Sequence, residues 1–243
     1  MASLYLDESL SAEAFVVAAS LSIGGDEARH AVQVARVRVG ERIAIGDGRG
    51  RIARGSVVEA TPGTVTIEVD EVEDAPHPSP SIRLVQALAK GDRDELAVQA
   101  ATELGVAEVV PWAAARSVSR WEGAKAQRGR ARWASIAREA AKQSIRSTVP
   151  VVAELATTAQ LARLTPLVLV LDPVAVEPIS AVDLDGVAEI TLVVGPEGGI
   201  DPKEFAALEA SGARRVRLGT EVLRTSTAGP AAIAALSIRL GRW

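Results

Sequence analysis

The chain has 243 residues, 48% hydrophobic and 3% aromatic, with a net charge of −4. This length allows one large or two modest domains, and the apolar content excludes a disordered chain. There is no cysteine, which excludes disulfides, thiolate metal sites and cysteine nucleophiles. The only histidines, His30 and His77, lie far apart in sequence, so we expect no metal site.

The sequence gives no sign of export or of membrane insertion. The N-terminal stretch MASLYLDESLS has neither a basic region nor a long apolar region, so it does not resemble a signal peptide. No apolar run approaches the roughly 20 residues that a membrane span needs. We therefore expect a cytoplasmic protein with no membrane partner.

The first third of the chain predicts short strands. Residues 42–45, 51–58 and 64–69 carry apolar side chains in loose alternation, and the turn signals Gly46-Asp47-Gly48 and Pro62-Gly63 separate them. This pattern indicates a small β-rich unit, a barrel or a sandwich. Residues 71–80 then combine acidic side chains with three prolines, which is typical of a linker. We accordingly expect one domain over residues 1–75 and a second over residues 76–243.

Beyond residue 80 the hydrophobic period alternates between that of strands and that of helices. Gly105 stands where a helix C-cap is expected, and Asp201 with Pro202 stands where a helix should begin. Such alternation predicts an α/β domain with a largely parallel sheet. The expected strands are 82–89, 106–112, 167–171, 189–194 and 214–218, and the expected helices are 94–104, 126–144, 202–211 and 227–240.

Basic residues gather in two segments although the chain as a whole is acidic. Residues 29–54 have a net charge of +5 and residues 116–146 one of +7. Together they hold 16 of the 27 basic residues and 4 of the 31 acidic ones. Such segregation is typical of a surface that binds a polyanion, although a solvated helix face and a basic hairpin remain the simpler interpretation of either segment alone.

Two loops at the carboxyl ends of expected strands are candidates for a ligand site. The first, GPEGG at residues 195–199, has three glycines that allow close approach of a ligand, and the helix after it offers amide groups at its N-terminus. It is neither a dinucleotide-binding fingerprint nor a P-loop. From the residues alone, a ligand loop and a plain turn before a helix remain open.

The second loop, LGTEVLRTSTA at residues 218–228, joins the last strand to the last helix. One interpretation is structural: Thr225 or Ser226 caps the helix and Arg224 is a surface charge. The other is functional: the backbone surrounds a small molecule, and Arg224 faces an anionic or carbonyl-bearing substrate.

Together these loops resemble the SPOUT class of knotted methyltransferases, and the whole chain resembles the RsmE family. Further matching segments are RH at 29–30, RVRVGE at 36–41, AKGDR at 89–93 and TELGV at 102–106, together with Gln143, Arg146 and the Val149-Pro150 pair. The resemblance implies methylation of N3 of a uridine in small-subunit ribosomal RNA, with S-adenosylmethionine as the methyl donor. It also implies an N-terminal PUA-like β-barrel, a C-terminal α/β domain with a trefoil knot, and a homodimer. Free RNA and the assembled 30S particle both remain possible substrates.

The resemblance also implies roles for particular residues. Arg224 is the candidate for stabilising charge during transfer, and no general base is evident, with Glu197 and His30 the weak candidates. The expected cofactor-binding residues are Leu171, Gly195, Pro196, Glu197, Gly198, Gly199, Leu218, Gly219, Val222, Leu223 and Thr225. The expected RNA-binding residues are His30, Arg36, Arg38, Lys90, Arg116, Arg120, Arg138, Lys142 and Arg146.

Two departures from the family pattern leave other functions open. The family has Glu where this chain has Ser226 and Lys142. A related knotted methyltransferase that acts on a ribose hydroxyl or on transfer RNA is one alternative, and an RNA-binding ribosome-assembly protein without catalysis is another. A nucleotide hydrolase is disfavoured, because no lysine follows the glycines and no carboxylate cluster suggests a metal site.

Overall fold

The computed structural model describes residues 3–75, 78–164 and 166–243. The chain divides into two compact units, Met1–His77 with Ala141–Val149, and Pro78–Ala140 with Pro150–Trp243. His77 and its neighbour at position 76, both in the expected linker, lie outside the described residues. We describe each unit by itself.

The first unit contains a five-stranded sheet in the order β1-β3-β4-β5-β2. β1 and β3 are parallel, and the other neighbouring pairs are antiparallel. This confirms the β-rich unit that the sequence predicts, although β1 and β2 were not expected. The strands are β1 (Leu4–Leu6), β2 (Ser20–Gly24), β3 (Arg42–Gly46), β4 (Arg51–Ala60) and β5 (Thr64–Asp74).

Alternation along the strands gives this sheet two apolar faces. On β3, Ile43 and Ile45 pack in the main core, whereas Ala44 points to a smaller cluster on the opposite side. Ile145 and Val149 cover that smaller cluster. The amide of Val149 also donates to the carbonyl oxygen of Gly48 at 2.9 Å. The segment Ala141–Val149 therefore completes the fold of the first unit although it lies far along the sequence.

The expected linker begins later than the sequence suggests. β5 continues to Asp74, which pairs with Arg51 of β4, so residues 71–74 are strand and not linker. Ion pairs to the arginines of β4 hold these acidic residues in the strand, and composition alone does not reveal such pairs. A short helix, α1 (Gly25–Arg29), leads into a π-helical turn, His30–Val34.

The second unit contains a seven-stranded sheet in the order β10-β12-β9-β11-β6-β7-β8. Every neighbouring pair in it is parallel, which confirms the predicted α/β class. The strands are β6 (Ser81–Ala87), β7 (Glu108–Trp112), β8 (Val151–Val152), β9 (Leu167–Leu171), β10 (Glu177–Pro178), β11 (Glu189–Val194) and β12 (Arg214–Arg217).

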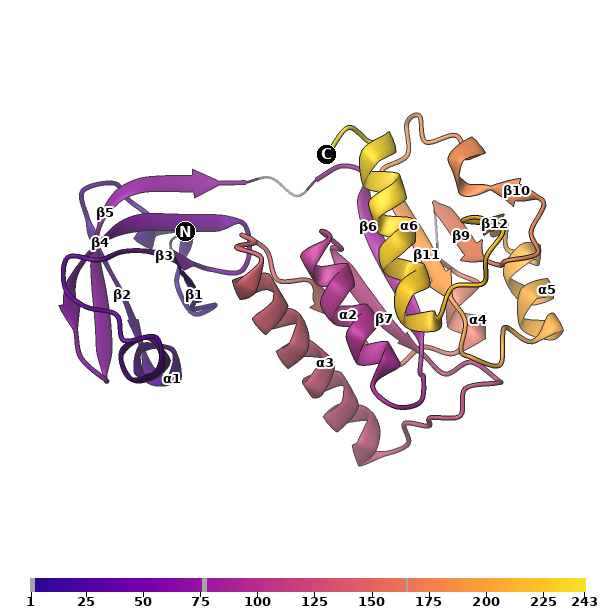
Figure 1. Ribbon diagram of the computed structural model, residues 1–243, viewed down its shortest axis with the longest axis horizontal. Coiled ribbons are helices and arrows are strands. Elements are labelled where there is room, and N and C mark those ends of the chain that lie inside the picture. The colour runs from indigo at the N-terminus through magenta and orange to yellow at the C-terminus, as the bar shows by residue number, and fades with distance from the viewer. Residues whose placement is uncertain (1–2, 76–77, 165) are drawn as a thin grey trace. The chain divides into compact units, whose positions relative to one another are not determined.

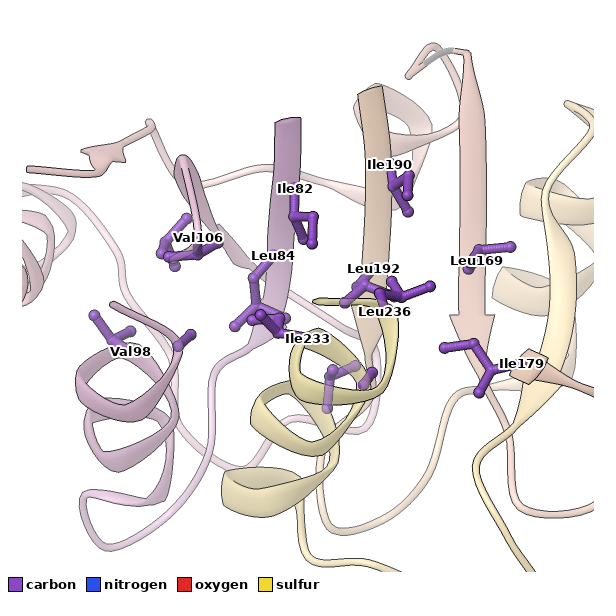
Figure 2. Packing of buried hydrophobic residues seen from close by; sticks show 14 of the residues in the cluster. Ile82, Leu84, Val98, Val106, Leu169, Ile179, Ile190, Leu192, Ile233 and Leu236 are labelled. Carbon is purple, nitrogen blue, oxygen red and sulfur yellow. The ribbon is translucent and has the colours of Figure 1, made fainter. Parts of the chain in front are cut away.

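Helices cover both faces of this sheet (Figure 1), which explains why its central strands β9, β11 and β6 carry buried apolar side chains on both faces. On β9, Leu169 belongs to the core cluster that includes residues of α2 and α6, and Val168 and Val170 belong to the cluster that includes residues of α4 and α5. In Figure 2, side chains of β6, β11 and β9 meet those of α2 and α6 in the first of these layers. The helices are α2 (Arg93–Glu103), α3 (Ala124–Gln143), α4 (Thr158–Leu161), α5 (Pro202–Ala210) and α6 (Thr225–Arg239).

The chain crosses the sheet between its last strand and its last helix. β12 pairs with β9, but α6 packs on β11 and β6 and lies beside α2 (Figure 1). Residues 218–224 therefore pass the carboxyl ends of β9 and β11 before α6 begins. This is the edge of a parallel sheet at which ligands bind.

Candidate active site

A cavity of about 590 Å³ lies at this crossing. Its walls come from the loops that follow β9, β11 and β12 and from the first turn of α6. The volume falls within the range of roughly 300–1,000 Å³ that is usual for small-molecule sites. The fold thus brings both of the loops singled out from the sequence into one pocket.

Glycine is required in the β11 loop for packing and for chain direction. A Cβ atom at Gly195 would lie 2.5 Å from Cγ1 of Ile200, closer than any real contact. Gly199 has φ +72°, and its amide donates to the carbonyl oxygen of Pro196 at 2.9 Å. The result is a tight turn whose backbone lines the cavity.

The helix after this loop uses its own side chains to cap its N-terminus. Asp201 accepts a hydrogen bond from the amide of Lys203 at 2.9 Å, and Glu204 reaches back to the amide of Asp201. The predicted N-cap is therefore confirmed. The expectation that this helix leaves its first amides for a ligand is wrong, because the capping box occupies two of them.

Glu197 joins the loop to the segment before α2. Its Oε1 accepts hydrogen bonds from the amide of Lys90 at 3.0 Å and from Nη1 of Arg93 at 2.9 Å. Burial alone would raise the pKa of Glu197, but the backbone hydrogen bonds and the Arg93 guanidinium outweigh it and lower the pKa. A carboxylate held ionised in this way is a poor proton acceptor, so the geometry gives Glu197 a structural role.

Thr225 does not cap α6. The helix begins at Thr225 itself, and the residue in the cap position is Arg224, whose side chain makes no capping hydrogen bond. The Thr225 hydroxyl is buried, accepts from Nε2 of Gln86 at 2.8 Å and donates to the carbonyl oxygen of Gly195 at 2.8 Å. The expectation that Thr225 or Ser226 caps the helix is therefore wrong, because both lie inside α6.

Arg224 is an exposed cation at the cavity. It lines the pocket, and among the described residues its guanidinium takes part in no ion pair. Its backbone carbonyl accepts from the amides of Thr227 and Ala228, so the side chain is carried by the first turn of α6. A cation beside a glycine-lined pocket is suited to a substrate that develops negative charge.

Known proteins resemble this chain along most of its length. A family model described as an RNA methyltransferase domain matches residues 76–237, and one described as an RNA methyltransferase PUA domain matches residues 23–70. A protein of Mycobacterium bovis named ribosomal RNA small subunit methyltransferase E is 42% identical and covers 91% of this chain and 87% of its own. The namesake in Bacillus subtilis is 32% identical and covers 90% of each chain.

A solved structure has the same fold. The crystal structure of a ribosomal RNA small subunit methyltransferase E from Neisseria gonorrhoeae, bound to S-adenosyl methionine, has a TM-score of 0.87 and 27% identity. It covers 98% of both chains. The chain belongs to the RsmE family of RNA methyltransferases. This confirms the resemblance seen in the sequence and, with it, the pairing of a PUA domain with a SPOUT-type α/β domain.

The cavity of this RNA methyltransferase gathers most of the residues expected to bind the cofactor. Gly198 is the exception: it does not line the cavity, and its carbonyl oxygen accepts from Nη1 of Arg116 at 3.3 Å. The expected residues that do line it are Leu171, Gly195, Pro196, Glu197, Gly199, Leu218, Gly219, Val222, Leu223 and Thr225, together with Arg224.

Sequence reasoning missed several residues of the cavity wall. Asp172 and Pro173 directly follow β9, so the rule that ligands bind at the carboxyl ends of strands was enough to find them. Glu221 lies inside the second loop and brings a carboxylate into the lining. Arg93 and Phe205 reach the cavity from helices, and no local signal in the sequence marks them.

The expected RNA-binding residues of the first unit lie at its surface. His30, Arg36 and Arg38 are exposed, and His30 begins the π-helical turn. The backbone of Arg36 has φ +59°, a value that is rare for residues other than glycine, asparagine and aspartate. Strained backbone of this kind clusters at functional sites, and it is consistent with a binding role.

The expected RNA-binding residues in the loops of the second unit are of two kinds. Some have exposed side chains at the surface, and others hold the loops through hydrogen bonds. Lys90 is exposed and only its backbone is engaged with Glu197. Arg116 holds the β11 loop through Gly198 and lies 3.4 Å from the Asp201 carboxylate. Arg120 donates to the carbonyl oxygens of Ala114 and Ala115.

The end of α3 and the segment after it behave differently from a solvated basic face. Lys142 is buried, with Nζ 2.9 Å from the Glu27 carboxylate. A buried, paired lysine cannot reach a phosphate, so we remove it from the expected RNA-binding set. Burial lowers the pKa of Arg146 to about 10, and Arg138 is half-buried beside Glu139.

Much of the basic charge of residues 29–54 is neutralised across the sheet. Arg42 donates to both carboxylate oxygens of Asp70, and Arg54 lies 2.9 Å from Glu73. The charge clusters counted along the sequence are therefore not the charge clusters of the surface. In the part of the chain that the structure describes, no helix is both long and apolar enough to cross a bilayer.

Proposed function

We propose that this protein transfers the methyl group of S-adenosylmethionine to N3 of a uridine in small-subunit ribosomal RNA. The observation that carries the proposal is the cavity at the chain crossing, where three carboxyl-end loops and Arg224 converge. Relatives that align along about nine tenths of the chain and are named ribosomal RNA small subunit methyltransferase E support it.

The lining of the cavity fits an adenosyl group. Gly195, Gly199 and Gly219 expose backbone without side chains, so a ligand can approach their amides and carbonyls closely. Leu171, Leu218, Val222 and Leu223 supply apolar contacts for an adenine ring. S-adenosylmethionine supplies an activated methyl group on a sulfonium, so the protein's main task is to position the acceptor in line.

Arg224 is positioned to stabilise the negative charge that develops on the acceptor base. Neutral uridine carries a proton on N3, and its loss spreads negative charge onto the two flanking carbonyl oxygens. A guanidinium at the start of α6, beside the cavity, would stabilise that charge. Glu197 is engaged with Lys90 and Arg93, so we assign it to the loop and leave the proton to another group or to water.

We further propose a division of labour along the chain. Residues 1–75 dock RNA, with His30, Arg36 and Arg38 at phosphates, and residues 76–243 carry out transfer. Because the proposed substrate is ribosomal RNA, we also propose that the protein acts in the cytoplasm. Both free RNA and the assembled 30S particle should be tested as substrates.

A homodimer is the partner state that we propose for the cavity. Two of its loops carry exposed apolar side chains, with Val174 78%, Val176 90% and Val222 79% exposed. Isolated surface valines are ordinary, but three on two loops that border one cavity offer apolar surface that a second copy would cover. Val176→Lys with Val222→Lys should convert a dimer to a monomer in analytical ultracentrifugation; an unchanged mass would contradict this interface.

The decisive experiment compares ribosomal RNA from cells with and without this gene. Mass mapping should show one methylated uridine in small-subunit RNA that disappears on deletion and returns with the wild-type gene. Calorimetry with the purified protein separates the competing functions, because an RNA-binding assembly factor without catalysis needs no affinity for S-adenosylmethionine. An unaltered methylation map, or no measurable cofactor binding, would refute the proposal.

A further inference from the structure

A second cavity, of about 450 Å³, lies beside the first in the α/β unit. It is bounded by residues 89–95, by the loop before α3 and by the N-terminal half of α3. The segment Ala89–Arg93 separates the two pockets: Lys90 lines the second, Arg93 lines the first, and Glu197 binds both. A ligand in the second cavity is thus one chain segment away from the proposed reaction centre.

The indole of Trp121 is held in place at the wall of this cavity. Trp121 lines it, and Trp133, which is fully buried, contacts Trp121 edge-on with ring centroids 5.1 Å apart. A Cβ atom at Gly129 would lie 2.4–2.7 Å from three atoms of the Trp121 ring, so the backbone of α3 rests on the face of the indole. Glycine inside a helix costs about 1 kcal/mol relative to alanine, which indicates that this contact is worth keeping.

Cations of α3 also line this cavity. Lys125, Arg128 and Arg132 stand at i, i+3 and i+7 of α3, on one face of the helix. Arg132 is engaged with Glu95, with Nη2 2.6 Å from Oε2. Lys125 and Arg128 are exposed, and neither belongs to an ion pair among the described residues.

Carboxylates in the cavity have defined positions. Asp94 is buried and accepts hydrogen bonds from the amides of Ala89 and Glu95 at 3.0 and 2.9 Å, so it shapes the segment and does not face a ligand. Asp92, with φ +60°, remains an acceptor on the wall next to Lys90. An aromatic ring, uncommitted cations and an acceptor together match the base, the phosphate and the N–H groups of a nucleotide.

We propose that this cavity binds a nucleotide of the RNA substrate adjacent to the methylated one, with its base against Trp121 and its phosphate at Lys125 and Arg128. The proposal rests on the proposed function, because it takes the substrate to be RNA. It gives α3 a specific role that its basic composition alone did not define. It also explains why Glu197 ties the segment between the pockets to the loop of the first one.

Two variants with matched controls test the cavity. Trp121→Ala removes the ring, and Trp243→Ala removes an exposed indole outside either pocket. Lys125→Gln with Arg128→Gln removes two cations, and Arg163→Gln with Lys203→Gln removes two exposed cations elsewhere. The probe is small-subunit ribosomal RNA transcribed in vitro, and S-adenosylmethionine affinity is measured in parallel.

Each cavity variant should weaken RNA binding about tenfold and leave cofactor affinity within about twofold, whereas both controls should bind RNA like the wild type. The loss in Trp121→Ala should persist at high salt, and the loss in the charge variant should shrink. Because Trp121 also packs against the core, a Trp121→Ala protein that fails to fold leaves the decision to the charge variant.

Cavity variants that bind RNA as tightly as their controls would overturn the proposal. That result is distinguishable from failure of the proposed function, in which the wild-type protein binds RNA but methylates no uridine in it. In the second case the comparison of RNA affinities still decides whether the cavity is a nucleotide site.

Discussion

Nε2 of Gln86 donates to the Thr225 hydroxyl, which in turn donates to the carbonyl oxygen of Gly195, both at 2.8 Å. This chain of hydrogen bonds connects β6, the first turn of α6 and the β11 loop. Gln86 is completely buried, and its Oε1 has no hydrogen-bond partner in the described structure. Burying an unpaired oxygen costs free energy, and such groups are retained where their other hydrogen bonds hold a structure in place. Here Gln86, through Thr225, holds the β11 loop that lines the cavity.

Thr225→Val keeps the shape of the side chain but leaves Gln86 and the Gly195 carbonyl without their partner. We expect a loss of roughly 1–3 kcal/mol in the free energy of unfolding, because buried polar groups remain unsatisfied. Affinity for S-adenosylmethionine should fall as well. Urea unfolding and calorimetry measure the two effects.

Thr227→Val is the matched control, since Thr227 is exposed on the same helix. It should change neither quantity appreciably. If both variants behave alike, the hydrogen-bond chain does not organise the pocket.

Glu197→Gln separates a structural role from that of a general base. The rate of methyl transfer should stay within about tenfold of the wild type, because the pKa of Glu197 is already lowered and its carboxylate is engaged with Arg93.

The same substitution should change the pH dependence of stability. A lowered pKa stabilises the fold above the unfolded-state pKa, and this contribution is lost as pH falls through the folded-state pKa. Acid unfolding of the wild type should therefore include a component that Glu197→Gln lacks and Glu122→Gln, at an exposed position, retains. Complete inactivation of Glu197→Gln with intact cofactor binding would restore it as the base.

Arg224→Ala should lower kcat by about a hundredfold or more, with S-adenosylmethionine affinity nearly unchanged, since its charge is needed when the acceptor becomes anionic. Arg224→Lys should recover part of the rate. Arg163→Ala serves as the exposed control. Near-normal turnover of Arg224→Ala would remove the residue from the mechanism.

The sequence predicted the position of the site because its signals are local. The apolar runs of β9 and β11 are buried on both faces, and the glycines follow directly after the second run. Rules for parallel sheets then place the loops at one edge. The same rules do not reveal Thr225, whose partners lie 139 and 30 residues away in sequence.

Charge was the least predictable property, because pairing depends on strand register and on tertiary packing. Arg42 looks like a surface cation until β3 is paired with β4 and β4 with β5, which brings Asp70 of β5 within reach. The end of α3 follows a helical period, and nothing in that period says that Ala141–Val149 packs in the first unit. The sequence therefore did not reveal that Lys142 is buried and paired with Glu27.

Lys142→Met should destabilise the protein by roughly 3–5 kcal/mol, because it leaves the Glu27 carboxylate buried without its cation. Adding Glu27→Gln should recover part of the loss in urea unfolding. Under conditions in which both proteins are folded, the RNA affinity of Lys142→Met should equal that of the wild type. A variant that is stable but binds RNA weakly would return Lys142 to the RNA-binding set.

Salt dependence distinguishes exposed arginines from paired ones in the first basic segment. Logarithmic RNA affinity falls linearly with logarithmic salt concentration, and each lost phosphate contact reduces the slope by about 0.7–0.9. Arg36→Ala with Arg38→Ala should therefore flatten the slope by roughly 1.4–1.8, since both side chains are exposed.

Arg42→Ala with Arg54→Ala changes the net charge by the same amount in the same segment. It should leave the slope nearly unchanged, because Asp70 and Glu73 already hold these guanidinium groups. Filter binding to small-subunit ribosomal RNA at several salt concentrations gives both slopes. Equal flattening in the two double variants would mean that RNA senses the total charge of the segment, and His30, Arg36 and Arg38 would lose their assignment as phosphate contacts.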